Sequence, residues 1–257
     1  MNWFSGQVPT KEEMRKELME YLNHAHGTKK YLRTTVRFLR TQRCLSLKKP
    51  YQDVWPGLES AAAGKNLALN DIKSAFRKKM LTLQKGRCCY CRRWLVNTAY
   101  AKPIEHILPR KHYPQYALEF WNMAVACSNC NQEKKDDIWG GFPSTNSDYP
   151  KAHLFNSFFH PRFHKYDEHI SFVRTETNST SLVVFSGKSA QGKHLCRQLL
   201  SKVAAKENLY SNNLELSKAL QVIEIFQVNN EDVSLKFVDE FVRSLEESIR
   251  DVISDAF

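Results

Sequence analysis

Two short cysteine pairs decide how the middle of this chain folds: Cys88-Cys-Tyr-Cys91 and Cys127-Ser-Asn-Cys130. A Cys-x-x-Cys turn presents two thiolates to one metal ion, and two such turns supply the four ligands of a tetrahedral zinc site. The sequence therefore predicts a structural zinc ion held by Cys88, Cys91, Cys127 and Cys130. The alternative interpretation is a chance pair beside other buried thiols.

The number of cysteines argues against a disulfide framework and for a reducing compartment. The chain has seven cysteines, an odd number, and its first residues lack the basic and then apolar stretches of a secretory signal. The sequence contains no run of about 18 apolar residues, which a transmembrane helix would need. We therefore expect a cytoplasmic protein with no membrane partner.

Residues with catalytic chemistry lie between the two pairs and just after the second one. Glu105 precedes His106, Asn122 precedes the second pair, and Asn131 follows its last cysteine. The imidazole of a histidine titrates near neutrality, which suits a general base. A glutamate carboxylate is a hard oxygen donor, which suits Mg²⁺ or Mn²⁺. Each residue also has an ordinary structural explanation: a buried histidine, an acid on a strand, an orienting amide or a helix cap.

This order of residues resembles the zinc-ribbon HNH endonucleases of the ββα-metal superfamily. Their pattern is C-x-x-C, an acid or histidine before a histidine, an asparagine, and then C-x-x-C-N/H-x-x-K, and every position is filled here between residues 88 and 134. The resemblance implies metal-dependent hydrolysis of phosphodiester bonds that leaves 5′-phosphate and 3′-hydroxyl ends.

The resemblance also implies a role for each residue of the pattern. His106 would be the general base, and Glu105 and Asn131 would be the protein ligands of a catalytic Mg²⁺ or Mn²⁺. Asn122 would complete the catalytic set without touching the metal, by holding the loop of the base through backbone hydrogen bonds. The zinc would be structural, because a site closed by four cysteines leaves no open coordination position.

Three cations near the pattern are candidates for contacts with the phosphates of a nucleic acid. They are Arg110 and Lys111, which follow the proposed base, and Lys134, the last position of the pattern. For Lys134 the alternative is an ordinary lysine on an exposed helix.

Charge is distributed unevenly along the 257 residues, although the formal net charge is only +11. Residues 27–111 hold 20 Lys and Arg against four acids, whereas residues 198–257 hold six against 11. A basic front half is typical of a protein that meets a polyanion such as nucleic acid, and a solvated Lys-rich helical surface is the alternative. The acidic tail would face a protein partner or simply pack on the core.

Local patterns predict helices on both sides of the cysteine-rich segment. Thr10 and Glu13 form a capping box that would open a helix through about residue 23, and a basic helix is expected over 29–45. Asn70 would cap a third helix through about residue 84, in which Ile72 and Phe76 face inward. Two short strands are expected over 170–173 and 181–185, and helices over 190–207, 214–226 and 232–253.

These elements predict an α+β fold in which a small zinc-stapled ββα-metal core is flanked by helical regions. The expected divisions are a basic helical region over 1–85, the HNH nuclease core over 86–138, a loop with a short hairpin over 139–186, and an acidic helical region over 187–257.

A second resemblance concerns the segment from His160 to Phe172, which reads HPRFHKYDEHISF. It is similar to the segment that follows the HNH motif in the nuclease subunits of Septu-type bacterial anti-phage systems, including those attached to some retrons. This resemblance implies a defence nuclease that works with an ATPase subunit encoded nearby.

The sequence as a whole favours a metal-dependent HNH endonuclease with DNA favoured over RNA as its substrate. The alternative is a zinc-stapled nucleic-acid-binding or adaptor module without catalysis. Glu105, His106 and Asn131 separate the two hypotheses, because binding alone would not need them.

Overall fold

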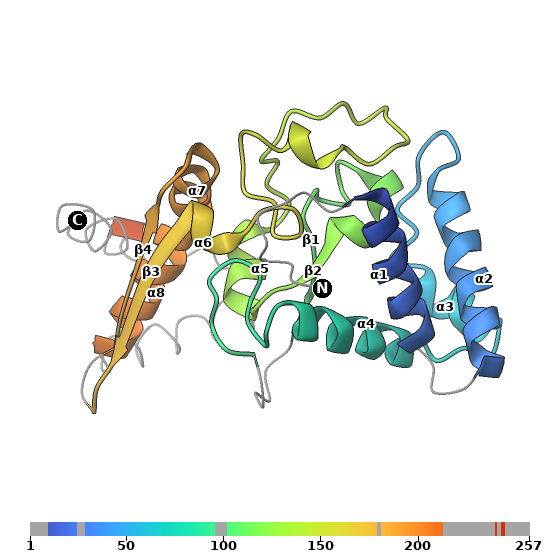
Figure 1. Cartoon of the computed structure of the whole chain (residues 1–257), viewed down its shortest axis with the longest axis horizontal. Coiled ribbons are helices and arrows are strands. Elements are labelled where there is room, and N and C mark those ends of the chain that lie inside the picture. The colour runs from blue at the N-terminus through green and yellow to red at the C-terminus, as the bar shows by residue number, and fades with distance from the viewer. Residues whose placement is uncertain are drawn as a thin grey trace. The chain divides into compact units, whose positions relative to one another are not determined.

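The computed structural model describes residues 10–24, 29–95, 102–178, 181–212, 240 and 243–244. It combines helices with two small antiparallel sheets, which confirms the predicted α+β class. The chain divides into two compact units, Met1–Glu168 and His169–Phe257, so the loop after residue 138 belongs to the first unit (Figure 1).

The first unit begins with helices and continues into a small sheet and a long loop. The described elements up to Glu168 are α1 (Lys11–His24), α2 (Lys29–Ser46), α3 (Leu58–Ala63), α4 (Leu69–Leu83), β1 (Ile104–His106), the 3-10 turns η1 (Pro114–Tyr116) and η2 (Phe120–Asn122), β2 (Met123–Val125), α5 (Ser128–Lys134), the 3-10 turn η3 (Ala152–Leu154) and the start of α6 (Tyr166–His169).

The start of α1 follows the predicted capping box. The backbone N–H and the hydroxyl of Thr10 donate to the Glu13 carboxylate over 2.8 and 3.1 Å, and the Glu13 N–H donates back to the Thr10 hydroxyl over 3.2 Å. These bonds satisfy N–H groups that the first helical turn leaves without partners. The predicted cap of α4 was wrong: Ala68 occupies that position, and Asn70 lies inside the helix.

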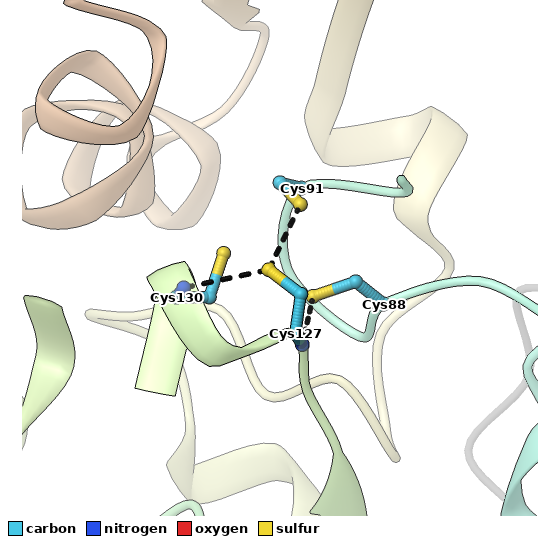
Figure 2. Close-up of side chains that lie close together, drawn as sticks. All are labelled: Cys88, Cys91, Cys127 and Cys130. Atoms are coloured by element: carbon cyan, nitrogen blue, oxygen red, sulfur yellow. Dashed lines mark hydrogen bonds between the residues drawn. The ribbon is translucent and has the colours of Figure 1, made fainter. Parts of the chain in front are cut away.

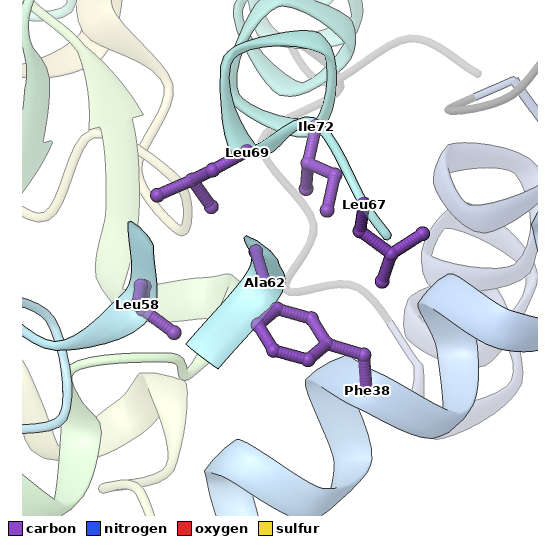
Figure 3. Close-up of a cluster of buried hydrophobic side chains, with 6 residues drawn as sticks. All are labelled: Phe38, Leu58, Ala62, Leu67, Leu69 and Ile72. Atoms are coloured by element: carbon purple, nitrogen blue, oxygen red, sulfur yellow. The ribbon is translucent and has the colours of Figure 1, made fainter. Parts of the chain in front are cut away.

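The helices pack around one cluster of buried apolar side chains drawn from α2, α3, α4 and the turn between the last two. Figure 3 shows the six residues pointing toward one another: Phe38, Leu58, Ala62, Leu67, Leu69 and Ile72. Phe76 is buried one turn further along α4, which agrees with its predicted inward position. This cluster gives the first unit a core of its own beside the sheet.

A buried ion pair connects the first helix to the segment after the sheet. The Arg162 guanidinium donates to the Glu17 carboxylate over 2.6 Å, and both side chains are almost fully enclosed. Arg162 also donates to the carbonyl oxygens of Phe120 and Met123, over 3.3 and 3.0 Å. One side chain thus holds α1, β2 and the loop together, which rigidifies the back of the small sheet.

The second unit contains a β-hairpin packed on a helical segment. Its described elements are β3 (Ile170–Glu176), β4 (Ser181–Gly187), α7 (Ala190–Leu195), the π-helical segment η4 (Cys196–Leu200) and α8 (Ser201–Asn212). The Asn208 side chain exchanges two hydrogen bonds with the backbone of Val183, of 2.8 and 3.0 Å, which fixes α8 on the hairpin.

The two predicted strands are confirmed and extend further than expected, because the strands pair over their whole length from Ile170 with Gly187 to Glu176 with Ser181. The helices expected over 214–226 and 232–253 lie outside the described residues, apart from three positions. Among the described residues, no helix is long and apolar enough to cross a membrane.

Candidate metal centre and active site

A ββα unit carries the candidate site. Strands β1 and β2 pair antiparallel with Glu105 opposite Ala124 and His106 opposite Met123, and α5 begins three residues after β2. The Gln84 side chain at the end of α4 exchanges hydrogen bonds of 2.8 and 2.9 Å with the backbone of Val125. The Gln84 amide thus makes the two hydrogen bonds to Val125 that a neighbouring strand would make, and it fixes the end of β2.

Four buried cysteines meet beside this unit. Their sulfurs all lie within 4.8 Å of one another, and the Sγ atoms of Cys91 and Cys127 are 3.6 Å apart. Figure 2 shows the first pair on the turn after α4, with Cys127 just before α5 and Cys130 in its first turn. The predicted zinc ligands are thus brought together, although they come from segments 36 residues apart.

The donor set and its spacing fit zinc. Tetrahedral coordination with Zn–S bonds of about 2.3 Å places neighbouring sulfurs about 3.8 Å apart, close to the separation of Cys91 and Cys127. Hydrogen bonds to the neighbouring cysteine sulfurs, that of Cys127 above all, together with burial hold the pKa of the Cys91 and Cys130 thiols well above its ordinary value. A divalent cation among the sulfurs favours the thiolates and reverses this effect.

The proposed base has a defined orientation. His106 lies at the end of β1, and its Nε2 is 3.0 Å from the carbonyl oxygen of Ala117. A carbonyl oxygen can only accept, so Nε2 carries the proton and Nδ1 of the neutral ring keeps its lone pair. The geometry therefore makes Nδ1 a proton acceptor, which is what a general base requires.

The environment of His106 also keeps the ring neutral. Burial, followed by the positive charge of Arg110, lowers the pKa of His106 to about 3, while the Ala117 carbonyl opposes this shift. The imidazole is thus neutral across the physiological range of pH, so Nδ1 is free to accept a proton, and the lowered pKa makes the ring a weaker base than an unperturbed histidine.

A tryptophan that no sequence pattern singles out covers one side of the proposed base. Trp55 lies edge-on to the His106 ring, with ring centroids 4.6 Å apart. The Arg110 guanidinium lies 5.7 Å from the centre of the Trp55 ring and is ion-paired with Asp53. The segment before α3 therefore contacts both the base and one of the predicted phosphate-binding cations.

Asn122 makes the hydrogen bonds expected of a residue that holds the loop of the base. Its Oδ1 accepts from the Leu108 N–H over 2.7 Å, and its Nδ2 donates to the carbonyl oxygens of Leu108 and Tyr116 over 3.0 and 3.1 Å. Leu108 lies two residues after His106. Tyr116 directly precedes Ala117, whose carbonyl oxygen accepts the hydrogen bond from His106. One buried amide thus fixes both the chain that carries the ring and the turn that orients it.

Glu105 is enclosed next to the base and paired with Lys134. The Lys134 Nζ lies 2.7 Å from Oε1 of Glu105, and the Tyr90 hydroxyl donates to the same oxygen over 3.2 Å. Burial raises the pKa of Glu105, and the charge of Lys134 opposes this shift. Both described contacts use Oε1, which leaves Oε2 as the carboxylate oxygen that can meet an ion.

The structure differs from the prediction that Lys134 contacts phosphate. The Lys134 side chain is 0% exposed, and its ammonium also donates to the carbonyl oxygen of His106 over 3.1 Å. Lys134 lies four residues after the buried Cys130 on α5, so both side chains share the inward face of the helix. Lys134 therefore neutralises Glu105 and braces β1 in place of reaching a substrate.

The remaining predicted residues, Asn131, Lys111 and Arg110, are all at least partly exposed. Asn131 lies in the middle of α5 and is half-buried, and its side-chain amide makes no hydrogen bond to any described residue. Lys111 is largely exposed, with Nζ 4.0 Å from the Asp136 carboxylate. Arg110 is one-third exposed and shares its charge with Asp53. Arg110 and Lys111 thus remain accessible, whereas Lys134 does not.

Comparisons with known proteins point to the same segment. Residues 88–137 match the family model described as HNH endonuclease, so the chain contains an HNH domain. The match covers the ββα unit and all four cysteines, and it supports nuclease activity at the level of the family. Searches of curated proteins and of solved structures find no significant match to the chain.

Proposed function

We propose that this protein is a metal-dependent HNH endonuclease that hydrolyses phosphodiester bonds, with DNA as the favoured substrate. The observation that carries the proposal is the bond from His106 to the Ala117 carbonyl, which makes Nδ1 of a neutral imidazole a base. Glu105 beside it and Asn131 on α5 complete the residue set of the family that matches this segment.

In the proposed reaction His106 takes a proton from the attacking water. Its Nδ1 accepts that proton, while the Ala117 carbonyl holds the proton on Nε2 and stabilises the imidazolium that forms. Asn122 keeps the ring aimed by fixing the chain on both sides of it.

Glu105 and Asn131 are the proposed ligands of a catalytic Mg²⁺ or Mn²⁺. A carboxylate oxygen and an amide oxygen are both hard donors, and they match the preference of these ions. A bound divalent ion would supply positive charge for the pentavalent phosphate and the leaving oxygen. The ammonium of Lys134 lies next to the same carboxylate, so it would share the charge of Glu105 with the ion.

Substrate and biological setting are supported by charge and by the second resemblance. The basic segment over 27–111 would hold the phosphate backbone without reading its sequence, with Arg110 and Lys111 nearest the base. The segment from His160 to Phe172 supports a role as the effector of a bacterial anti-phage system. In that role the acidic tail over 198–257 would meet an ATPase partner.

The test is cleavage by purified full-length protein in Mg²⁺ or Mn²⁺, with and without the neighbouring ATPase. Linear and supercoiled DNA and a structured RNA would serve as substrates. We expect cleavage by the wild type, loss of cleavage in EDTA and in His106→Ala, and full activity in His153→Ala, which changes an exposed histidine. Binding without cleavage under every condition would favour the adaptor module and contradict the proposal.

A further inference from the structure

Two residues outside the segment that matches the HNH family reach the loop of the base. Tyr149 and His160 lie in the long loop between α5 and α6, after residue 137. The Tyr149 hydroxyl donates to Oδ1 of Asn122 over 3.2 Å, and it lies 2.8 Å from Nε2 of His160. The contacts therefore form a chain from His160 through Tyr149 to the residue that holds the base.

The direction of this chain follows from the other nitrogen of His160. The Arg162 N–H donates to Nδ1 of His160 over 3.2 Å, so Nδ1 bears no proton and Nε2 of the neutral ring does. Nε2 then donates to the Tyr149 oxygen, and the only hydroxyl proton of Tyr149 is left for Asn122. Burial keeps the pKa of His160 well below its ordinary value, which maintains the neutral form.

With this bond, every hydrogen-bonding site of the Asn122 side chain is used. Oδ1 accepts from the Leu108 N–H and the Tyr149 hydroxyl, and Nδ2 donates to the carbonyl oxygens of Leu108 and Tyr116. An amide rotated by half a turn would set a donor against two donors. The hydroxyl of Tyr149 therefore helps to select the one orientation of Asn122 that serves the base.

The surrounding rings leave His160 and Tyr149 little freedom. His160 is fully buried and stacked on Phe163 with ring centroids 4.1 Å apart, and Phe155 lies edge-on to it at 4.4 Å. Tyr149 lies edge-on to Tyr116, whose backbone carbonyl is bonded to Asn122, with centroids 5.1 Å apart. An aromatic cluster thus fixes the donor chain in place.

We propose that Tyr149 and His160 are positioning residues of the nuclease site, which act on His106 through Asn122. The inference rests on the proposed nuclease activity. The loop after the HNH segment is then part of the catalytic apparatus, because it completes the hydrogen bonds that hold the base. It also gives a role to His160, the first residue of the segment from His160 to Phe172.

The main test compares Tyr149→Phe with Tyr113→Phe in the full chain. Both changes remove one hydroxyl and keep the ring, but among the described residues the Tyr113 hydroxyl donates only to the backbone carbonyls of Gly140 and Phe142. For Tyr149→Phe we expect kcat to fall about tenfold, the rate equivalent of one lost hydrogen bond, with KM unchanged. Tyr113→Phe should keep kcat within about twofold of the wild type.

A second readout does not depend on cleavage. Hydrogen exchange of the Leu108 amide, which donates to Asn122, should be about tenfold faster in Tyr149→Phe and unchanged in Tyr113→Phe. If the wild type cleaves no nucleic acid, the proposed function fails, and this exchange measurement still decides the inference. Equal exchange and equal kcat in wild type and Tyr149→Phe would overturn it, as would an equal loss in Tyr113→Phe.

His160 is tested by rescue with a side chain that retains the donor. Glutamine can place an N–H near the position of Nε2, whereas alanine cannot. His160→Ala should lower kcat at least as much as Tyr149→Phe does, and His160→Gln should recover part of the loss. With Tyr149→Phe present, the two His160 variants should cleave equally. A persistent difference there would show that His160 does not act through the tyrosine.

Discussion

The two ends of the ββα unit are held by different means. At the zinc end, four cysteines from two Cys-x-x-Cys turns bring their sulfurs within 4.8 Å of one another. At the end of the proposed base, the His106 ring donates to the Ala117 carbonyl, and Asn122 bonds the backbone of Leu108 and Tyr116. A metal can stabilise a fold through a few ligands in short motifs. The orientation of a catalytic side chain depends on contacts from several separate segments.

The largest effect is expected at the zinc end. Cys127→Ala removes one ligand and also the sulfur that accepts from the Cys130 N–H at the start of α5. Because structural zinc contributes about 10 kcal/mol or more to the folding of small domains, the ββα unit should lose its metal and its ordered structure. Metal analysis and amide exchange over 86–138 would measure this. Cys44→Ala, at an exposed cysteine, should retain the zinc.

The buried pair of Glu105 and Lys134 should give the next largest effect. Lys134→Met leaves an uncompensated buried carboxylate, so we expect the free energy of unfolding to fall by about 3–5 kcal/mol. Adding Glu105→Gln should restore part of that loss, because the remaining charge is then gone. Denaturant unfolding of the three variants tests this. If Lys134→Met were as stable as the exposed control Lys111→Met, the pair would have no structural role.

The hydrogen bonds of Asn122 should affect catalysis more than stability. Asn122→Asp keeps the shape of the side chain but replaces the amide that donates to Leu108 and Tyr116 by an acceptor. We expect single-turnover cleavage to fall about 100-fold through a misaimed base, with the zinc retained. Normal cleavage by this variant would show that the orientation of His106 does not depend on the hydrogen bonds of Asn122.

The smallest effect concerns pH. Because burial lowers the pKa of His106 to about 3, the ring should stay neutral as the pH falls from 8 to 5. Since the unfolded histidine has the higher pKa, near 6.5, this group favours the folded state above that pH and loses its contribution as the pH falls toward 3. An NMR titration of the His106 ring should show no midpoint above pH 5, and a midpoint between 6 and 7 would contradict the buried environment.

The part of this architecture that the sequence predicts is the local part. The capping box at Thr10, the two strands after His169 and the four zinc ligands follow from residues close together in the chain or at a fixed spacing. The hydrogen bonds of Asn122 were expected from the resemblance, and the structure shows that they reach Leu108 and Tyr116.

The rest depends on contacts between distant residues, for which the sequence offers no spacing rule. Trp55 contacts His106 although 51 positions separate them in the sequence, and Lys134 lies inward, where it pairs with Glu105. Asparagine is a favoured residue at helix N-caps, but α4 begins one residue before Asn70. His160 lies outside the cysteine-rich pattern, and its contact with the hydroxyl of Tyr149 becomes visible only in the fold.

The central claim is that His106 is the base of a nuclease whose fold is held separately by zinc. Its most direct test is single-turnover cleavage by wild type and His106→Ala, each with its zinc content measured, in saturating Mn²⁺. We expect equal zinc, the same unfolding temperature within a few degrees, and a cleavage rate about 1,000-fold lower in the variant. Equal cleavage rates in two zinc-loaded proteins would contradict it.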